Sequence, residues 1–467
     1  MTPELLDTFA AIVGAKNAIR NGNEMAGYMQ EPRDLWHGKS PLVLRPASTD
    51  EVSQILKLAH ETGTAVVPQS GNTGLVGGQI PFENGKEILL SLDRMTRILE
   101  VDATDNTMTV EAGVTLKAVQ DAADTADRMF PLRIASEGTC RIGGNLSTNA
   151  GGLNVLAYGN ARDLCLGLEV VLPDGRIWNG LRRLRKDNTG YDLKNLFMGA
   201  EGTLGVITKA VLKLYPKVRS FETAFIAVTS PQAAVDLLSL LREMSGNRVV
   251  AFELLPRIAM DFTVKHMGLA NPLQDFSPWY ALSELADPVE GCLAQALEIA
   301  MERGWVADAT LAQSEAQRQA LWAIRELMPE SQKFEGGSIK HDISVPVSKV
   351  PVFITEATQA VNRFMPDARV LSFGHMGDGN LHFNISQPVG MDKQQFLDTW
   401  HDINAVVFEV VAKYHGSISA EHGIGRLKRD HMTDIKSPVE LQMMRDLKKL
   451  FDPRNIMNPG KVLPPSS

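Results

Sequence analysis

Cysteine is scarce in this chain of 467 residues, where Cys140, Cys165 and Cys292 are the only three. They are too few and too widely separated for a disulfide framework or a Cys-x-x-Cys metal site. This usage is typical of a reducing compartment. The simplest interpretation of each thiol is a small buried hydrophobic side chain.

Long apolar runs and an excess of basic charge are also missing. No run approaches the ~20 apolar residues that span a bilayer, and residues 3–14, an expected amphipathic helix, lack the cationic start of a signal peptide. A net charge of −8 gives no basic surface for nucleic acid or anionic lipid. With 44% hydrophobic and 22% charged residues, the chain is long enough for two or three globular domains. We expect a cytoplasmic protein without a nucleic-acid partner.

The most informative stretch is GHMGDGNLHFN, residues 374–384. Glycines interrupt it between two apolar runs, a pattern that predicts a strand, a tight turn and a second strand. Such a hairpin brings His375 and His382 close together across the turn. Asn384 shares the face of His382, because side chains alternate along a strand.

A second segment, SISAEHGIG at residues 417–425, supplies a carboxylate in Glu421. Two imidazoles and one carboxylate suit zinc or a similar divalent ion, and three protein ligands leave a coordination position open, as in catalytic sites. His422 can face whatever fills that position. The alternative is two satisfied turn histidines and a surface acid, and the hairpin alone does not decide between them.

Three glycine-rich clusters lie upstream, at residues 68–78, 142–152 and 199–207. Glycines remove side chains and expose backbone N–H groups, which allows a chain to wrap a pyrophosphate. The first cluster lacks both the Rossmann and the Walker spacing. Together the clusters can enclose a long phosphorylated ligand; plain glycine-rich turns are the alternative for each.

From about residue 220 the pattern changes to longer alternating elements with few glycines. It predicts an antiparallel sheet with helices on one side, and therefore an α+β protein. We also expect helices over residues 348–364 and 393–415. Arg325, in an expected helix, and Lys340, in an expected strand, are candidate carboxylate anchors. A solvated cation is the alternative for each.

In their order, the three glycine clusters resemble the FAD domain of the vanillyl-alcohol oxidase superfamily, over most of residues 39–217. The motifs GHMGDGNLHFNI, AEHGIG and FDPRNIMNPGKV resemble the C-terminal half of FAD-linked D-2-hydroxy acid dehydrogenases, most closely the D-2-hydroxyglutarate dehydrogenase branch. The resemblance implies three parts: an FAD-binding domain (1–217), an antiparallel-sheet substrate domain (218–417) and a helical C-terminal segment (418–467) that packs back on the first.

The resemblance also implies which residues contact the cofactor. Members that attach FAD covalently often carry a histidine where this chain has Asn72, so we expect non-covalent FAD. The expected FAD contacts are mostly glycines and small polar residues: Gly71, Asn72, Thr73, Gly74, Gly78, Ser136, Gly138, Gly143, Gly144, Ser147, Asn149, Gly151, Ile207 and Asn458.

In the same family the two histidines and the glutamate bind a metal, and the histidine after the glutamate is the active-site histidine. The resemblance therefore assigns metal ligation to His375, His382 and Glu421, catalysis to His422, and substrate binding to Arg325, Lys340, Asn384 and His422. One position departs from the pattern. Where the hydroxyglutarate enzymes have a threonine, this chain has Pro329, so a contact to the far end of a diacid is missing.

The leading hypothesis is FAD- and metal-dependent oxidation of a D-2-hydroxy acid, with D-2-hydroxyglutarate favoured. His422 takes the hydroxyl proton, and hydride passes to the flavin. The expected electron acceptor is an electron-transfer flavoprotein or a quinone, with a homodimer left open. Three alternatives stand: a D-lactate or glycolate dehydrogenase, a metallohydrolase with purely structural glycine clusters, and a non-catalytic nucleotide- or metal-binding module.

Overall fold

Two units make up residues 1–465, the part of the chain that this computed structural model describes. The first contains Met1–Gly152, Gly159–Lys217 and the chain from Glu421 onward; the second contains Leu153–Tyr158 and Val218–Ala420. Compared with the predicted domains, residues 153–158 and 418–420 belong to the second unit. Within the described residues, no helix has the length and apolarity needed to cross a membrane.

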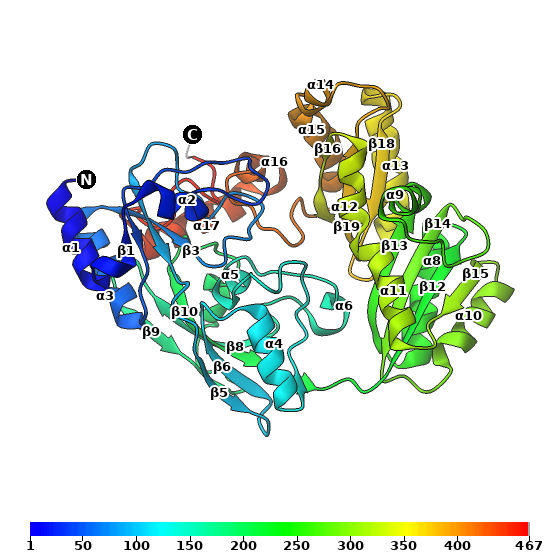
Figure 1. The fold of residues 1–467 in the computed structure, drawn as a ribbon, viewed down its shortest axis with the longest axis horizontal. Helices are drawn as coiled ribbons and strands as arrows, with labels where there is room; N and C mark the ends of the chain where they lie inside the picture. The colour runs from blue at the N-terminus through cyan, green and yellow to red at the C-terminus, as the bar shows by residue number, and fades with distance from the viewer. Residues whose placement is uncertain (466–467) are drawn as a thin grey trace. The chain divides into compact units, whose positions relative to one another are not determined.

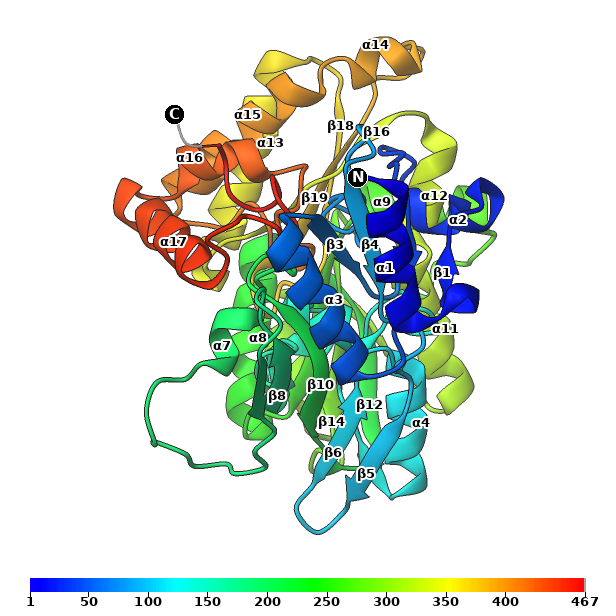
Figure 2. The same cartoon turned by 90° about the vertical axis from the view of Figure 1, so that its left-hand side faces the viewer.

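A four-stranded sheet forms the start of the first unit. Its strands, in spatial order, are β1 (Ala18–Ile19), β2 (Val43–Leu44), β4 (Glu87–Ser91) and β3 (Ala65–Gln69), with β2, β4 and β3 parallel. Helix α3 (Thr49–Thr62) begins where Ser48 accepts a hydrogen bond from the N–H of Glu51, and it ends at Gly63 with φ 69°. Figure 2 shows α3 beside α1 (Pro3–Val13).

A five-stranded antiparallel sheet follows in the same unit. Its spatial order is β5 (Ile98–Asp102), β6 (Thr107–Glu111), β10 (Val206–Lys213), β8 (Cys165–Val171) and β9 (Ile177–Gly180). Figure 1 shows helix α4 (Leu116–Thr125) beside these strands. The remaining elements of this unit are α2 (Gly22–Met29), β7 (Arg128–Met129), α5 (Ile142–Ser147), α7 (Lys194–Phe197), β11 (Tyr215–Pro216), α16 (Met432–Ile435) and α17 (Pro438–Phe451).

The first sheet of the second unit is antiparallel, in the order β13 (Val249–Pro256), β14 (Trp279–Ala286), β12 (Phe221–Val228) and β15 (Val306–Leu311). Helices α9 (Arg257–Met267) and α11 (Glu315–Glu326) share one core cluster with one face of it. Helices α8 (Pro231–Ser245) and α10 (Cys292–Glu302) also pack on its strands (Figure 1). Every residue of β13 is buried, so both faces are covered and the prediction of helices on one side is wrong.

The second sheet of this unit is built on β19 (Asn380–Ser386). Strand β18 (Arg369–Phe373) pairs with one edge of it, and β16 (Ser338–Ile339) and β17 (Asp342–Ser344) pair with the other. The remaining α-helices of the second unit are α6 (Val155–Tyr158), α12 (Met328–Ser331), α13 (Val350–Phe364), α14 (Lys393–Leu397) and α15 (Trp400–Lys413).

The single helix predicted over residues 393–415 is wrong, because α14 and α15 are separate helices. Between them, the hydroxyl of Thr399 donates to the backbone oxygen of Phe396 at 2.7 Å. Threonine side chains that bond to nearby backbone in this way compete with helical hydrogen bonding. The first helix therefore ends one turn after it begins.

Candidate active site

A cavity lies in the first unit. It is lined by residues from the three glycine clusters, within 68–79, 143–148 and 201–207, together with Leu92, Arg141 and His422. The first of these segments is the loop that follows β3, and the third leads into β10. Segments more than 100 residues apart in sequence thus form one concave surface, as the resemblance requires of an extended cofactor.

Close backbone packing explains why glycine occupies two positions in this cavity. A Cβ on Gly71 would lie 2.6 Å from the backbone oxygen of Thr139, and a Cβ on Gly143 would lie 2.7 Å from the Cβ of Ala112. Real Cβ atoms do not approach other atoms so closely. Glycine therefore allows the first two clusters to pack directly against neighbouring chain. Because glycine has no side chain, nothing at these two positions covers the backbone N–H groups.

Several buried polar atoms around the cavity lack a partner within residues 1–465. They include Ser70 Oγ, Asn72 Oδ1 and Asn458 Oδ1. Asn72 has φ 52°, and its Nδ2 donates to the backbone oxygens of Gly27 and Gln30, both at 2.9 Å, which fixes the side chain. Buried polar groups are normally hydrogen-bonded. A polar ligand with phosphate and heterocyclic groups fits these unsatisfied atoms.

The cavity brings together nine of the fourteen expected cofactor residues: Gly71, Asn72, Thr73, Gly74, Gly78, Gly143, Gly144, Ser147 and Ile207. Five do not line it: Ser136, Gly138, Asn149, Gly151 and Asn458. Asn458 instead donates from Nδ2 to the backbone oxygens of Gly78 and Glu201, both at 2.9 Å, and so ties the C-terminal tail to the cavity wall.

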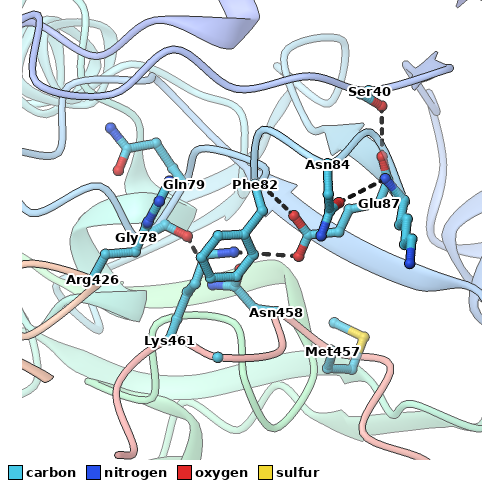
Figure 3. A network of polar contacts seen from close by, with 12 residues as sticks. Ser40, Gly78, Gln79, Phe82, Asn84, Glu87, Arg426, Met457, Asn458 and Lys461 are labelled. Atoms are coloured by element: carbon cyan, nitrogen blue, oxygen red, sulfur yellow. Dashed lines mark hydrogen bonds and ion pairs between the residues drawn. The ribbon is translucent and has the colours of Figure 1, made fainter. Parts of the chain in front are cut away.

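Figure 3 shows how the tail is held beside that wall. Lys461 Nζ lies 3.3 Å from an Oε of Glu87 on β4 and 4.0 Å from the ring centre of Phe82. The guanidinium carbon of Arg426 lies 4.4 Å from the same ring. Burial lowers the pKa of Lys461 to about 8. The sequence identified the tail as turn-rich but gave no sign of this buried ion pair.

Glu201 is a cavity residue that the sequence analysis did not single out. Its carboxylate accepts hydrogen bonds from the backbone N–H groups of Ile424 at 2.7 Å and Gly425 at 2.9 Å. Burial raises the pKa of Glu201 to about 7, against the opposing effect of these two N–H groups. The residue itself has φ 50° within the third glycine cluster. It thus fixes the loop that carries His422.

In the second unit, the expected hairpin forms from β18 and β19. Phe373 pairs with His382 in register, and His375 follows two residues after Phe373. The ring centres of His375 and His382 are 5.4 Å apart with the planes inclined at 75°, and each ring has a nitrogen within 4.8 Å of one in the other. The two imidazoles therefore converge across the turn as predicted, close enough to share one ion.

A glutamate that sequence reasoning missed stands behind this pair. Glu253 on β13 is 0% exposed, and its Oε1 lies 2.6 Å from Nδ1 of His375. Its Oε2 accepts a hydrogen bond of 2.5 Å from Nε of Arg325. The interactions with His375 and Arg325 lower the pKa of Glu253 to about 2, although burial alone would raise it. The only signal in the sequence was an acid inside the otherwise apolar run of residues 249–256.

The other expected substrate residues also lie in the second unit. Asn384 is 4% exposed, and its Nδ2 donates to Oε1 of Gln332 at 3.0 Å. Lys340 is half-buried directly after β16. Pro329 is the first-turn proline of α12, a position that suits proline because no N–H is needed there. Its ring offers no hydroxyl group.

Glu421 and His422 are the first two residues of the first unit's C-terminal segment. A carboxylate oxygen of Glu421 lies within 4.8 Å of a ring nitrogen of His422. The residue before them, Ala420, donates its N–H to the backbone oxygen of Asp342 at 3.4 Å, and Asp342 pairs with His382. The chain thus reaches Glu421 directly from the strand pair that carries His382.

Two family matches and several relatives agree on the class of protein. Residues 40–180 match the family described as FAD binding domain, and residues 217–462 match FAD linked oxidases, C-terminal domain. A mitochondrial D-2-hydroxyglutarate dehydrogenase of Arabidopsis thaliana is 38% identical over 463 residues, covering 98% of this chain and 81% of the relative. A D-2-hydroxyglutarate dehydrogenase of Stutzerimonas stutzeri is 36% identical over 463 residues, covering 98% and 99%.

Solved structures show the same fold at low identity. A p-cresol methylhydroxylase with bound substrate has a TM-score of 0.75 at 15% identity, covering 98% of this chain and 96% of that chain. The fold is therefore of the vanillyl-alcohol oxidase type, and the expected α+β class is confirmed. The glycine-lined cavity of the first unit, with its unpartnered polar atoms, fits the cofactor that this fold binds.

Proposed function

The chain belongs to the FAD-linked oxidases and is an FAD-dependent dehydrogenase, and on this premise we propose that it oxidises D-2-hydroxyglutarate to the 2-oxo acid. One observation carries the proposal: the buried guanidinium of Arg325 and the imidazole of His375 share the carboxylate of Glu253. The guanidinium of Arg325, which can bind an anionic substrate, thus lies close to the imidazole pair of His375 and His382. The activity for which the relatives are named supports the choice of acid.

We propose that His375, His382 and Glu421 hold a divalent cation, zinc or a similar ion. Two imidazole nitrogens and one carboxylate oxygen are a donor set that zinc takes in catalytic sites, with one position left open. Bound there, such a cation lowers the pKa of a coordinated hydroxyl group. The convergence of the two rings and the direct succession of Ala420 and Glu421 support this donor set.

The chain's own residues divide the remaining work. Arg325 and Lys340 bind the carboxylates, Arg325 through its planar fork and Lys340 as a point charge, and Asn384 donates an amide hydrogen bond. His422 accepts the proton of the substrate hydroxyl, a task suited to an imidazole pKa near neutrality. The bound FAD supplies the two-electron oxidant. Its non-covalent attachment is proposed from Asn72, which stands where covalent members have histidine.

A smaller D-2-hydroxy acid, D-lactate or glycolate, is the second candidate substrate. Pro329 favours it, because this position offers no hydroxyl group to a distal carboxylate. Against it, a substrate with a methyl group or hydrogen at the far end would offer no distal carboxylate to the terminal nitrogens of Arg325. Membership of the FAD-linked oxidases argues against both the metallohydrolase and the non-catalytic alternatives.

The test is anaerobic addition of D-2-hydroxyglutarate, D-lactate or D-malate to the purified holoenzyme while the flavin absorbance is followed. We expect D-2-hydroxyglutarate to bleach the flavin fastest. Chelation should abolish the bleaching, and added zinc or another divalent ion should restore it. An unchanged rate after chelation would remove the metal from the proposal, and faster bleaching by D-lactate would change the substrate.

Three further properties are inferred from the family and the composition. We infer that electrons leave to an electron-transfer flavoprotein or a quinone, that the protein works in the cytoplasm, and that a homodimer is compatible with the fold. Reduction assays with each acceptor, cell fractionation and light scattering of the holoenzyme test them one by one.

A further inference from the structure

We propose that Glu253 is a positioning residue that orients the metal ligand His375 and the substrate anchor Arg325 at the same time, through the two oxygens of one carboxylate. The inference rests on the proposed function, because it takes His375 as a ligand and Arg325 as an anchor. It adds a residue that no sequence motif identifies, and it makes metal binding and substrate binding depend on one side chain.

Each of the two carboxylate oxygens of Glu253 accepts one hydrogen bond. Oε1 lies 2.6 Å from Nδ1 of His375, and Oε2 lies 2.5 Å from Nε of Arg325. A carboxylate at Nδ1 accepts that ring N–H, so the lone pair of the neutral ring lies on Nε2. Metal-binding histidines are commonly oriented in this way, by a carboxylate on the nitrogen that does not bind the metal.

The backbone holds His375 against β13 independently of the side-chain contact. Leu254, the neighbour of Glu253, exchanges two hydrogen bonds with Gly374, of 2.9 and 3.0 Å. On the other side of His375, the N–H of Gly377 donates to the backbone oxygen of Phe252 at 3.2 Å. The backbone hydrogen bonds therefore fix the position of the main chain at His375, and the hydrogen bond to Glu253 fixes the orientation of its imidazole ring.

Arg325 is held in a matching way. Arg325 is 6% exposed, and its guanidinium carbon lies 5.0 Å from the ring centre of Phe373. Only Nε is bonded to Glu253, and within residues 1–465 the terminal nitrogens make no other hydrogen bond. The fork that binds a carboxylate bidentately is thus available, in an orientation that Glu253 fixes.

The same helix provides a control pair. One strand over, Glu284 on β14 accepts hydrogen bonds from Arg318 at 2.6 and 2.8 Å and from the indole N–H of Trp322 at 2.9 Å. Arg318 and Arg325 both belong to α11. Glu284 is also buried, at 3% exposed, and also pairs with an arginine, but within residues 1–465 it makes no hydrogen bond or ion pair with a histidine. It has the structural role of Glu253 without the proposed positioning role.

The experiment compares Glu253→Gln, Glu253→Asp and Glu284→Gln with the wild-type holoenzyme. Zinc affinity is measured by competition with a chelator of known affinity, FAD content by absorbance, and KM and kcat with D-2-hydroxyglutarate. We expect Glu253→Gln to weaken zinc binding about 10- to 100-fold, to raise KM, and to keep FAD content unchanged. Glu284→Gln should keep wild-type zinc affinity and KM while unfolding at a lower temperature.

Glu253→Asp keeps the charge but shortens the side chain by one methylene, so we expect a zinc affinity between those of the wild type and the glutamine variant. It decides the question if Glu253→Gln does not fold. Wild-type zinc affinity in either folded Glu253 variant would overturn the inference while leaving the metal proposal intact. A wild-type holoenzyme that binds no divalent ion would instead overturn the metal proposal, and this inference with it.

Discussion

Glu253 in the second unit is fully buried and Glu201 in the first is half-buried, and each lies near residues proposed to act on substrate, yet their pKa values move in opposite directions. That of Glu253 falls to about 2 and that of Glu201 rises to about 7. Glu253 faces a guanidinium and an imidazole, whereas Glu201 is bonded to the backbone N–H groups of Ile424 and Gly425.

The difference shows that burial alone does not set the charge of a carboxylate, because the partners can oppose its effect with different strength. Desolvation disfavours the ionised form of both groups. The interactions with His375 and Arg325 outweigh it at Glu253, whereas two backbone N–H groups and the charge of Lys428 do not outweigh it at Glu201. In the second unit, an ionised carboxylate on Glu253 thus holds the site residues. In the first unit, the carboxyl group of Glu201, which is only partly ionised at neutral pH, holds the loop that carries His422.

Removing His422 should have the largest effect. His422→Ala is expected to lower kcat by about 100- to 10,000-fold, the usual contribution of a general base. FAD content should stay unchanged, because the loop is held through the backbone of Ile424 and Gly425 and not through this side chain. Steady-state kinetics and flavin absorbance check both parts. Equal loss of activity and flavin would mark the histidine as structural.

Removing the guanidinium of Arg325 breaks the charge balance of the second unit. Arg325→Met should lower the free energy of unfolding by about 3–5 kcal/mol, because it leaves Glu253 buried with one cation fewer. Urea denaturation at pH 7 measures it. The double variant Arg325→Met, Glu253→Gln should recover part of the loss. No recovery would mean that the guanidinium acts through packing on Phe373 and not through its charge.

The two carboxylates should respond oppositely to pH. The folded pKa of Glu253 lies below its ordinary 4.5, so its stabilising contribution is present above pH 4.5 and is lost as the pH falls toward 2. The folded pKa of Glu201 lies above 4.5, so its contribution is present below that value and is lost as the pH rises toward 7. Urea midpoints of the wild type and each Glu→Gln variant, measured from pH 2 to 8, test both directions. Parallel pH profiles would contradict the comparison.

Neutralising Glu201 should have the smallest effect. Glu201→Gln is expected to lower the free energy of unfolding at pH 7 by about 1–3 kcal/mol, because the amide oxygen replaces only one of the two carboxylate oxygens and leaves one of the two N–H groups without an acceptor. Thermal unfolding of the holoenzyme measures it, with Glu253→Gln as the contrasting variant. A large destabilisation would show that Glu201 is held as a full anion.

Local sequence patterns were enough to predict several structural elements correctly. Ser48 marks the start of α3, and the glycines of residues 374–379 mark the turn between β18 and β19. The convergence of His375 and His382 follows from that turn. Where side chains compete with the local pattern, the prediction failed: the bond from Thr399 to Phe396 accompanies the break between α14 and α15.

The sequence by itself determined the class of protein, the hairpin with its two histidines and the glycine-rich clusters, because spacing along a strand or turn is a local property of the chain. Only the tertiary structure decided that Glu253 meets His375 across 122 positions and that Glu201 meets Ile424 across 223. A buried carboxylate is defined by the charges and dipoles around it. These charges and dipoles belong to segments that are distant in sequence, so only the packing of the sheets and loops brings them to the carboxylate.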